Sequence, residues 1–260
     1  MPVYFLADAA AFFAATEPAR AKRYIAAAAN GGECAWQLYG RHALFVAGDY
    51  VPSVDKEASL FALRAYMALA EADEQAARPK WLRRASDTAL WVDTFHYQLN
   101  IPLAADRPRS APYSRFNDWA RDWFEGQSTT GLGFIEVGHS GVDSTGSEFV
   151  PELLRLYERT HDESVLNMAL IQLHNTKQML DVDGRKGYHE RGFMPELWIF
   201  AVQSYADPGG TGTTKNFNRG IGHHLNVPWP TACAALGIAR SCIALGAERL
   251  AQLTGQGFCA

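Results

Sequence analysis

Paired amphipathic helical patterns joined by short polar turns are the feature that most constrains the fold of this chain. Apolar residues recur at three- and four-residue steps in five windows, a spacing that places them on one face of an α-helix. These windows are 59–69, 81–97, 149–157, 165–180 and 231–253. No window shows the sustained apolar and polar alternation of a half-buried strand. The sequence therefore predicts an all-α chain.

A weak internal repeat groups these helices into hairpins. The polar turn 70–73 joins two apolar stripes, and the turn 157–162 joins two more with similar spacing. The opening stretch 11–29 has the same pattern, with Pro18 at a position suited to the first turn of a helix. We therefore expect helical hairpins that pack side by side.

Long segments rich in Gly, Pro, aromatic and polar residues separate the hairpins. They are 30–54, 100–146, 181–195 and 206–229. Long loops inside a compact domain are usually functional or mobile, and here they alternate with tight turns. Hairpins arranged around an axis would gather these loops at one end of a funnel-shaped (α/α) toroid, whose mouth is the expected ligand site.

Size and charge narrow the class of partner. A chain of 260 residues that is 48% hydrophobic can form one domain over 1–260 with a substantial core. Its net charge of -4, without a long Lys/Arg run, argues against nucleic acid or an anionic membrane as partner. The start has no basic region before its apolar residues, and no apolar run reaches about 18 residues. We expect a soluble chain without an export signal, of unspecified oligomeric state.

The cysteines and acidic loops predict no metal site and no cofactor. The four cysteines are Cys34, Cys233, Cys242 and Cys259. They lie far apart, with no C-x-x-C pair and no His at ligand spacing, so we expect buried thiols and no disulfide framework. The loop that starts at Asp181 resembles a calcium loop, but Gly192 stands where its twelfth residue should be Glu.

A glycine-rich loop, 138–148, is the first candidate for chemistry. It places His139 and two carboxylates, Asp143 and Glu148, directly before the apolar helical window 149–157. Loops held by a rigid helical scaffold often carry catalytic groups. Asp143 is flanked by glycines, which let the backbone turn sharply and a ligand approach closely. It is the first candidate catalytic residue, and a cap of the following helix is the alternative.

Glu148 and Glu190 are candidates for a second carboxylate. Glu148 ends the sequence Thr-Gly-Ser-Glu, which fits a capping box, so a helix cap is its main alternative. Glu190 stands between His189 and Arg191 on a loop rich in charged and aromatic residues. These groups can transfer a proton or bind an acidic ligand, and a solvated charged loop is the alternative.

Aromatic and imidazole groups complete the candidate binding surface. Trp198 and Trp229 follow polar loops, and flat rings of this kind stack on the apolar faces of ligands. The paired His223 and His224 precede Trp229 in a loop with glycines, and we interpret them as lining the substrate site. A hydrogen-bonded structural pair is the alternative. Trp81 falls inside a helical window and is expected in the core.

Three segments resemble the six-hairpin glycosidase superfamily, the (α/α) toroids that include unsaturated glucuronyl hydrolases and related enzymes acting on uronic-acid sugars. Residues 156–162 are similar to the Leu-Tyr-Glu-x-Thr-Gly-Asp turn of that superfamily, and the segments 141–148 and 174–185 add to the likeness. The resemblance covers roughly the last two thirds of the chain. It implies six hairpins, whereas the sequence supplies about four, so we expect an incomplete ring or a fragment of a longer chain.

The resemblance implies a glycoside hydrolase that acts on an oligosaccharide, including one that contains uronic acid. Such hydrolysis needs a carboxylic acid and a carboxylate on either side of the scissile bond, and Asp143, Glu190 and Glu148 are the candidates. Two alternatives stay open. One is a polysaccharide lyase on a similar toroid, and the other is a non-catalytic glycan-binding module built from helical repeats. The candidate lyase residues are His139, Tyr188, His189 and Arg191.

Overall fold

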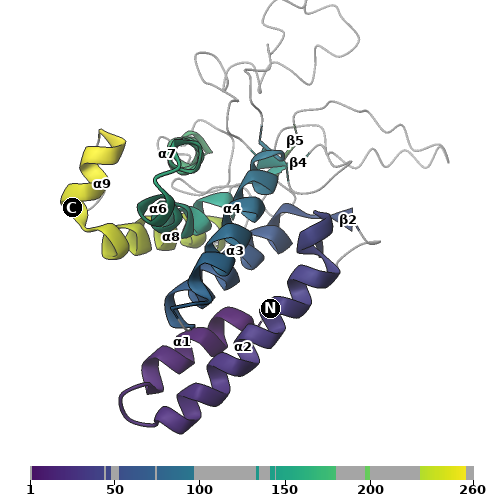
Figure 1. Ribbon diagram of the computed structural model, residues 1–260. Helices are drawn as coiled ribbons and strands as arrows, with labels where there is room; N and C mark the ends of the chain where they lie inside the picture. The colour runs from purple at the N-terminus through teal and green to yellow at the C-terminus, as the bar shows by residue number, and fades with distance from the viewer. Residues whose placement is uncertain are drawn as a thin grey trace, which may run out of the picture.

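The computed structural model describes residues 2–43, 45–47, 53–73, 75–96, 133–134, 141–143, 145–179, 197–199 and 229–255. Most of these residues lie in helices, which confirms the predicted all-α class (Figure 1). The strands among them are two or three residues long. Such short strands leave no alternating pattern in the sequence, which is why none was expected.

The described helices form consecutive hairpins. The pairs are α1 (Val3–Phe13) with α2 (Pro18–Leu38), α3 (Lys56–Ala72) with α4 (Arg78–Asp93), α6 (Val150–Thr160) with α7 (Glu163–Met179), and α8 (Trp229–Leu245) with α9 (Ala247–Thr254). The two helices of each pair contact each other, and Pro18 lies in the first turn of α2 as predicted. The first helices of successive hairpins touch in the order α1, α3, α6, α8 and so form one layer (Figure 1).

Local polar groups set several helix ends. Asp55 caps α3 by accepting a hydrogen bond from the backbone amide of Ala58 at 3.0 Å. At the tight turn after α6, His161 adopts a left-handed conformation with a φ of 56°, where the superfamily turn has Gly. Asp162 then accepts hydrogen bonds from the Ser164 hydroxyl at 2.7 Å and amide at 2.9 Å. These bonds lower the pKa of Asp162 and fix the start of α7.

The last helical window is broken, contrary to the continuous pattern over 231–253. Gly246 has a φ of 79°, a left-handed conformation that ends α8. The axes of α8 and α9 therefore differ by 110°. Among the described helices, none is by itself long and apolar enough to cross a membrane, and only this bent pair together meets those limits of length and composition.

Helices α3 and α6 run parallel. Arg64, near the middle of α3, pairs with Glu152 in the first turn of α6 at 3.1 Å. Farther along both helices, Glu71 of α3 pairs with Arg155 of α6 at 3.0 Å. Contacts that advance together along two helices require the helices to point the same way.

Helix α8 runs parallel to α6 by the same criterion. Gly237 of α8 lies against the backbone of Ser147 just before α6, and Arg240 farther along bonds to Glu152. The N-terminal ends of α3, α6 and α8 therefore lie at one end of the layer. The long segments of the chain lead into these N-terminal ends, near the strands in Figure 1. The short turns within the hairpins lie at the opposite end.

Two small antiparallel sheets accompany the helices. The strands are β1 (Val46–Ala47), β2 (Ser53–Val54), β3 (Gly133–Phe134), β4 (Gly141–Asp143) and β5 (Leu197–Ile199), and the short 3-10 helices are η1 (Gly40–His42) and η3 (Thr145–Phe149). Strand β1 pairs with β2, and the second sheet has the order β3-β4-β5. In its register Val142 lies opposite both Phe134 and Trp198. The second sheet therefore joins the segments that precede α6 and α8.

Helix α3 lies at the centre of the hydrophobic core. The fully buried side chains are mainly on α3 and α6, and they include Leu60, Leu63, Tyr66, Met67, Leu69, Leu153, Leu154 and Leu156. Trp81 of α4 is also fully buried, which confirms its predicted place in the core. Its ring stacks on that of Tyr66, with centroids 6.1 Å apart.

The cysteine prediction is wrong at two positions. Cys34 is exposed, because the buried stripe of α2 follows Ala28, Gly32 and Ala35 and leaves position 34 on the solvent side. Cys242 is disulfide-bonded. Cys233 is a partly buried free thiol, and Cys259 lies outside the described residues.

Gly237 lets α8 rest directly on the backbone of η3. A Cβ atom at this position would overlap with the carbonyl oxygen of Ser147 and lie 2.8 Å from its carbonyl carbon. Both atoms belong to the main chain, so no side-chain rotation can make room. The close approach also places Cys233, one helical turn earlier, beside Glu148.

We expect Gly237→Ala to destabilise the protein by about 1–3 kcal/mol, because overpacking forces α8 away from η3. This loss should appear even though Ala favours a helix over Gly by about 1 kcal/mol. Urea unfolding followed by circular dichroism measures the change. Ala239→Ser on the exposed side of α8 is the control and should change stability by less than about 0.5 kcal/mol. Equal stability of the Gly237 variant and the wild type would contradict the close contact.

Candidate functional site

The candidate site lies where the N-terminal ends of α3, α6 and α8 meet η3. Three side chains from three elements converge there: Glu148 from η3, Arg64 from α3 and Cys233 from α8. The Glu148 side chain keeps 16% of its surface exposed and Arg64 keeps 10%. The site is therefore largely buried, but its carboxylate still reaches solvent.

An ion pair with Arg64 holds the Glu148 side chain. Arg64 Nη1 donates to its Oε1 at 2.9 Å, and Arg64 Nη2 donates to its carbonyl oxygen at 3.3 Å. Helix α6 begins at Val150 with Phe149 as its N-cap and no side-chain cap hydrogen bond. The 3-10 turn η3 contains Glu148 and precedes α6, so Glu148 is not the third residue of α6.

Aromatic rings surround the Arg64 guanidinium. Its Cζ atom lies 4.3 Å from the ring centroid of Phe149, with Tyr4 at 5.5 Å and Phe61 at 5.9 Å. Burial lowers the pKa of Arg64, but the charges of the carboxylates beside it outweigh this effect, and its pKa is raised. Arg64 is thus a fixed cation held between rings and carboxylates.

Glu152 lies on the interior side of this pair and bonds to side chains of α3, α6 and α8. It is fully buried, and its Oε1 accepts hydrogen bonds from Arg64 at 3.1 Å, from Arg155 at 3.3 Å and from Arg240. Its Oε2 is buried without a hydrogen-bond partner in the structure. Arg64 therefore bonds Glu148 with one nitrogen and Glu152 with another, so the hub around Glu152 fixes the position of the site.

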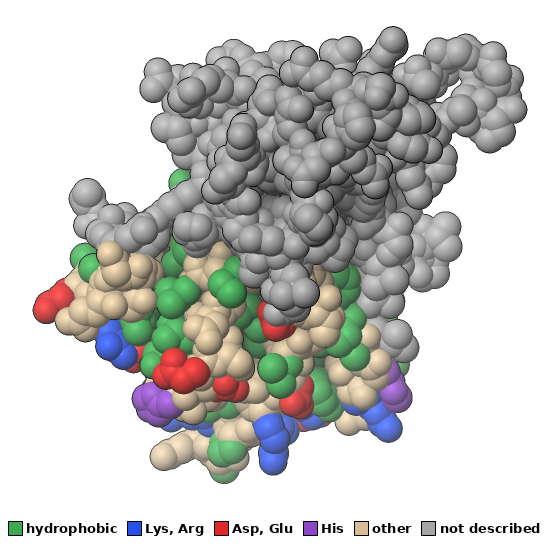
Figure 2. Space-filling view, turned by 90° about the horizontal axis from the view of Figure 1, so that it is seen from above, with side chains coloured by type: hydrophobic (Ala, Val, Ile, Leu, Met, Phe, Trp, Pro, Cys, Tyr) green, Lys and Arg blue, Asp and Glu red, His purple; other side chains and the backbone are tan. Residues whose placement is uncertain are grey.

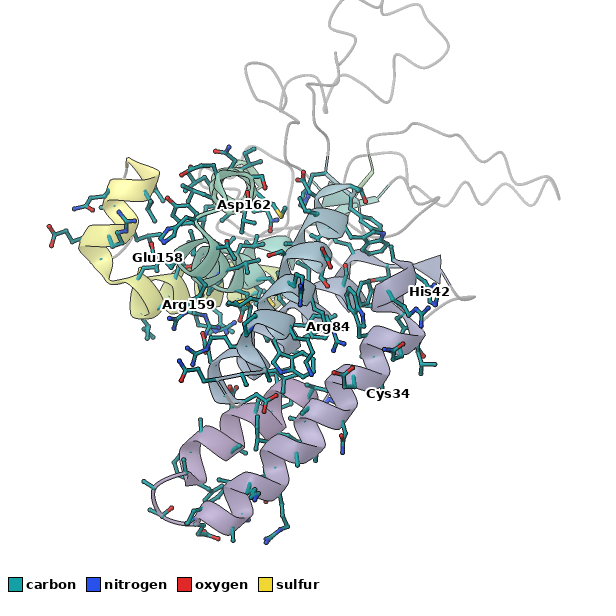
Figure 3. All side chains as sticks on the ribbon, in the orientation of Figure 1. Cys34, His42, Arg84, Glu158, Arg159 and Asp162 are labelled. Carbon is teal, nitrogen blue, oxygen red and sulfur yellow. The ribbon has the colours of Figure 1, made fainter. Side chains whose placement is uncertain are left out.

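We expect Glu152→Ala to cost about 3–5 kcal/mol of stability, because it leaves the buried Arg64 and the partly buried Arg155 and Arg240 without their shared carboxylate. Glu158→Ala is the matched control on the same helix. Glu158 also pairs with an Arg of the last hairpin, Arg249, at 3.2 Å, but both side chains are more than one third exposed (Figure 3). Its loss should cost less than about 1 kcal/mol. Urea unfolding should separate the two variants, and similar losses would contradict the role of the Glu152 hub.

Cys233 contributes a thiol to the site. Burial raises its pKa to about 12, and its hydrogen bond to Glu148 and the negative charge of that carboxylate add to the rise. A thiol with so high a pKa stays protonated near neutral pH. It acts here as a hydrogen-bond donor to Glu148 and not as a nucleophile.

We expect alkylation of Cys233 at pH 8 to be much slower than that of the exposed Cys34. A rise in pKa from 9.0 to about 12 leaves roughly a thousandfold less thiolate. Glu148→Gln should speed the labelling of Cys233, because it removes a charge that raises the pKa of the thiol. Peptide mass spectrometry after timed iodoacetamide labelling measures both rates. The Cys34 rate is the internal control, and an unchanged Cys233 rate in Glu148→Gln would contradict the contact.

The structure brings two predicted site residues onto neighbouring strands. Asp143 is the last residue of β4, where its backbone pairs with Leu197 of β5, and Trp198 is the next residue of β5. Asp143 is also five positions before Glu148 in the sequence. The alternative that Asp143 caps the following helix stays a prediction, because its side chain lies outside the described side chains.

The other predicted residues contribute less to the described site. Trp229 is the first residue of α8 and therefore lies at the same end of the layer as Glu148. Seven predicted residues lie outside the described part of the chain: His139, Tyr188, His189, Glu190, Arg191, His223 and His224. Among the side chains that the structure describes, no group of three or more His, Cys, Asp or Glu could hold a metal ion.

Sequence reasoning missed the cation of this site. Arg64 interrupts the apolar window 59–69, and a charged residue on a buried helical stripe indicates an ion pair. Its partners are more than 80 positions away, so the local pattern could not identify them. Cys233 and Arg240 likewise stand inside the apolar pattern of α8.

The described surface seen from above has hydrophobic side chains across its middle and basic side chains toward its margin (Figure 2).

Comparison with known proteins finds no match to this chain among family models, curated proteins or solved structures. Function is therefore inferred from the site itself. The Glu148 carboxylate can accept hydrogen bonds from a polar ligand, and Arg64 holds this carboxylate in a fixed position.

Proposed function

We propose that this chain is a carbohydrate-active hydrolase built on an incomplete (α/α) toroid of helical hairpins. Support comes from the layer of first helices, in which α3, α6 and α8 run parallel. Long segments enter these helices at one end, and short turns close the hairpins at the other. This arrangement agrees with the toroid that the sequence resemblance implies, in which the loop-rich end binds the sugar.

One observation carries the assignment of the site. Asp143, the first candidate from sequence, lies on a strand paired with the strand of Trp198, a few residues before the fixed Glu148. A sugar site requires a carboxylate for proton transfer and a large aromatic ring for stacking. In the register, Asp143 lies opposite Leu197 and Trp198 lies opposite Val142, so positions 143 and 198 are on opposite faces of the sheet. We therefore assign proton transfer to Asp143 and sugar stacking to Trp229, which begins α8 at the same end of the layer as Glu148.

The ion pair changes the role proposed for Glu148. Its Oε1 already accepts a hydrogen bond from Arg64, and Cys233 donates to the same carboxylate. A carboxylate bound in this way is poorly suited to donate a proton to a leaving group. We propose that Glu148 accepts a hydrogen bond from a sugar hydroxyl, and that Glu190 is the second acid of the reaction.

The reaction we propose is hydrolysis of a glycosidic bond in an oligosaccharide that contains uronic acid. One carboxylic acid protonates the departing oxygen while a carboxylate activates water or attacks the sugar carbon. The basic and imidazole groups near Glu190, together with His139, His223 and His224, are assigned to the carboxylate and hydroxyls of the substrate. No cofactor enters this proposal.

The test is incubation with a panel of uronic-acid and neutral oligosaccharides, with products weighed by mass spectrometry. We expect products that have gained water, and we expect Asp143→Asn to lower kcat/KM by about 10²–10⁴-fold through loss of proton transfer. Asp87→Asn is the control, because Asp87 is an exposed carboxylate on α4. It should leave the rate unchanged.

Other outcomes would contradict the hydrolase. An unsaturated product that absorbs in the ultraviolet would show a lyase, whose activity would survive loss of Asp143 better than loss of a His or Tyr. Binding of oligosaccharides without turnover would show a glycan-binding module. Circular dichroism of each variant separates loss of activity from loss of folding.

A further inference from the structure

A second cluster of polar side chains lies between α2, α3 and α4, apart from the candidate site. Arg84 of α4 points toward α2, where its Nη2 donates to Glu33 Oε2 at 2.8 Å (Figure 3). Lys80, one turn earlier on α4, donates to the other oxygen of Glu33 at 2.6 Å. Tyr66 of α3 is the fourth member, and we name these four residues the Glu33 cluster. Tyr66 follows Arg64 by two residues, so the two side chains leave α3 on different sides.

Aromatic rings enclose the inner part of the Glu33 cluster. The Arg84 Cζ atom lies 4.9 Å from the ring centroid of Trp81 and 5.1 Å from that of Trp36. The Tyr66 ring lies 6.1 Å from Trp81 and 6.0 Å from Trp36. Tyr66 is fully buried and Arg84 is 9% exposed, whereas the other two members keep more than one third of their side chains exposed. The cluster therefore has a buried inner end and a rim that reaches solvent.

Two polar atoms at the inner end are buried without a hydrogen-bond partner in the described structure, Tyr66 Oη and Arg84 Nη1. An unpaired buried polar group costs stability, so native structures keep few of them. Burial raises the pKa of Tyr66, so its hydroxyl stays protonated and can donate a hydrogen bond. The Arg84 nitrogen can only donate. The inner end therefore presents two donors that need an acceptor.

The charges of the Glu33 cluster favour an anion as this acceptor. The hydrogen bond from Arg84 is the main cause that lowers the pKa of Glu33, so Glu33 is ionised. Among the described side chains, Glu33 is the only carboxylate that pairs with Arg84 or Lys80, so two cations share one anion. Around the Glu152 hub, in contrast, three arginines pair with three carboxylates. An excess positive charge beside buried rings is costly, and a bound monoanion would balance it.

We propose that the Glu33 cluster binds the carboxylate of a small organic acid. The carboxylate oxygens accept hydrogen bonds from Arg84 Nη1 and from the Tyr66 hydroxyl, a pairing that suits the planar guanidinium. The half-buried ring of Trp36 offers apolar surface to the rest of the molecule. A bridging water would satisfy the same two atoms but would leave the positive charge unbalanced. This site is separate from that of the proposed hydrolase.

The test replaces chloride by formate at constant ionic strength and follows thermal unfolding and tryptophan fluorescence. We expect formate to raise the unfolding midpoint along a saturable curve, because it binds the folded state. Fluorescence should change over the same range, since Trp36 and Trp81 flank the site. Tyr66→Phe removes only the hydroxyl and should weaken the apparent affinity for formate about 10-fold. Without formate this variant should be at least as stable as the wild type, because it deletes a buried group that has no partner.

Tyr157→Phe is the matched control, because the Tyr157 hydroxyl also lies beside a carboxylate, that of Glu163 at 3.3 Å, but on the exposed surface of another hairpin. It should respond to formate as the wild type does.

Three results would overturn the proposal. A wild type that does not respond to formate would show that the Glu33 cluster binds no carboxylate. An equal response of the wild type and Tyr66→Phe would show a general effect of the salt. A loss of stability in Tyr66→Phe that is the same with and without formate would show that a water satisfies the hydroxyl. Circular dichroism confirms that each variant is folded, and because no readout involves turnover, the test is independent of the proposed hydrolase activity.

Discussion

The buried carboxylate of Glu152 is the interaction on which the arrangement of the described helices depends. A charge removed from water is tolerated only when opposite charges and hydrogen bonds surround it. Here the guanidinium groups come from α3, from α6 itself and from α8. A displacement of α3 or α8 along its axis relative to α6 would remove one hydrogen bond from this buried carboxylate, so the hub fixes the relative positions of these helices more strictly than apolar packing alone.

The same hub connects the scaffold to the candidate site. Arg64 bonds Glu152 in the interior and Glu148 near the surface. From α8, Arg240 bonds Glu152 and Cys233 lies beside Glu148. Each side chain of the site is therefore held by a group whose own position is determined by the core. A site built in this way needs little rearrangement to present its carboxylate, which favours binding of a ligand with a defined shape.

Local patterns predicted most of the helices, because a hairpin is specified by residues close together in sequence. Pro18 at the start of α2 and the tight turn at Asp162 are of this kind. Tertiary contacts decided the features that were predicted wrongly or missed. The sequence around Glu148 fits a capping box, and this local pattern could not identify the arginine 84 positions away that binds Glu148 in the structure. The helix break at Gly246 also lies within an apolar pattern that continues on both sides.

The contact between Gly237 and the Ser147 carbonyl has a consequence for how the sequence can vary. Main-chain atoms are the same at every position of a protein, so this contact does not depend on which side chain occupies position 147. The segment before α6 can therefore change its side chains while its path against α8 is preserved. Diversity in ligand preference can accumulate there without loss of the scaffold, provided that position 237 keeps a hydrogen atom in place of a side chain.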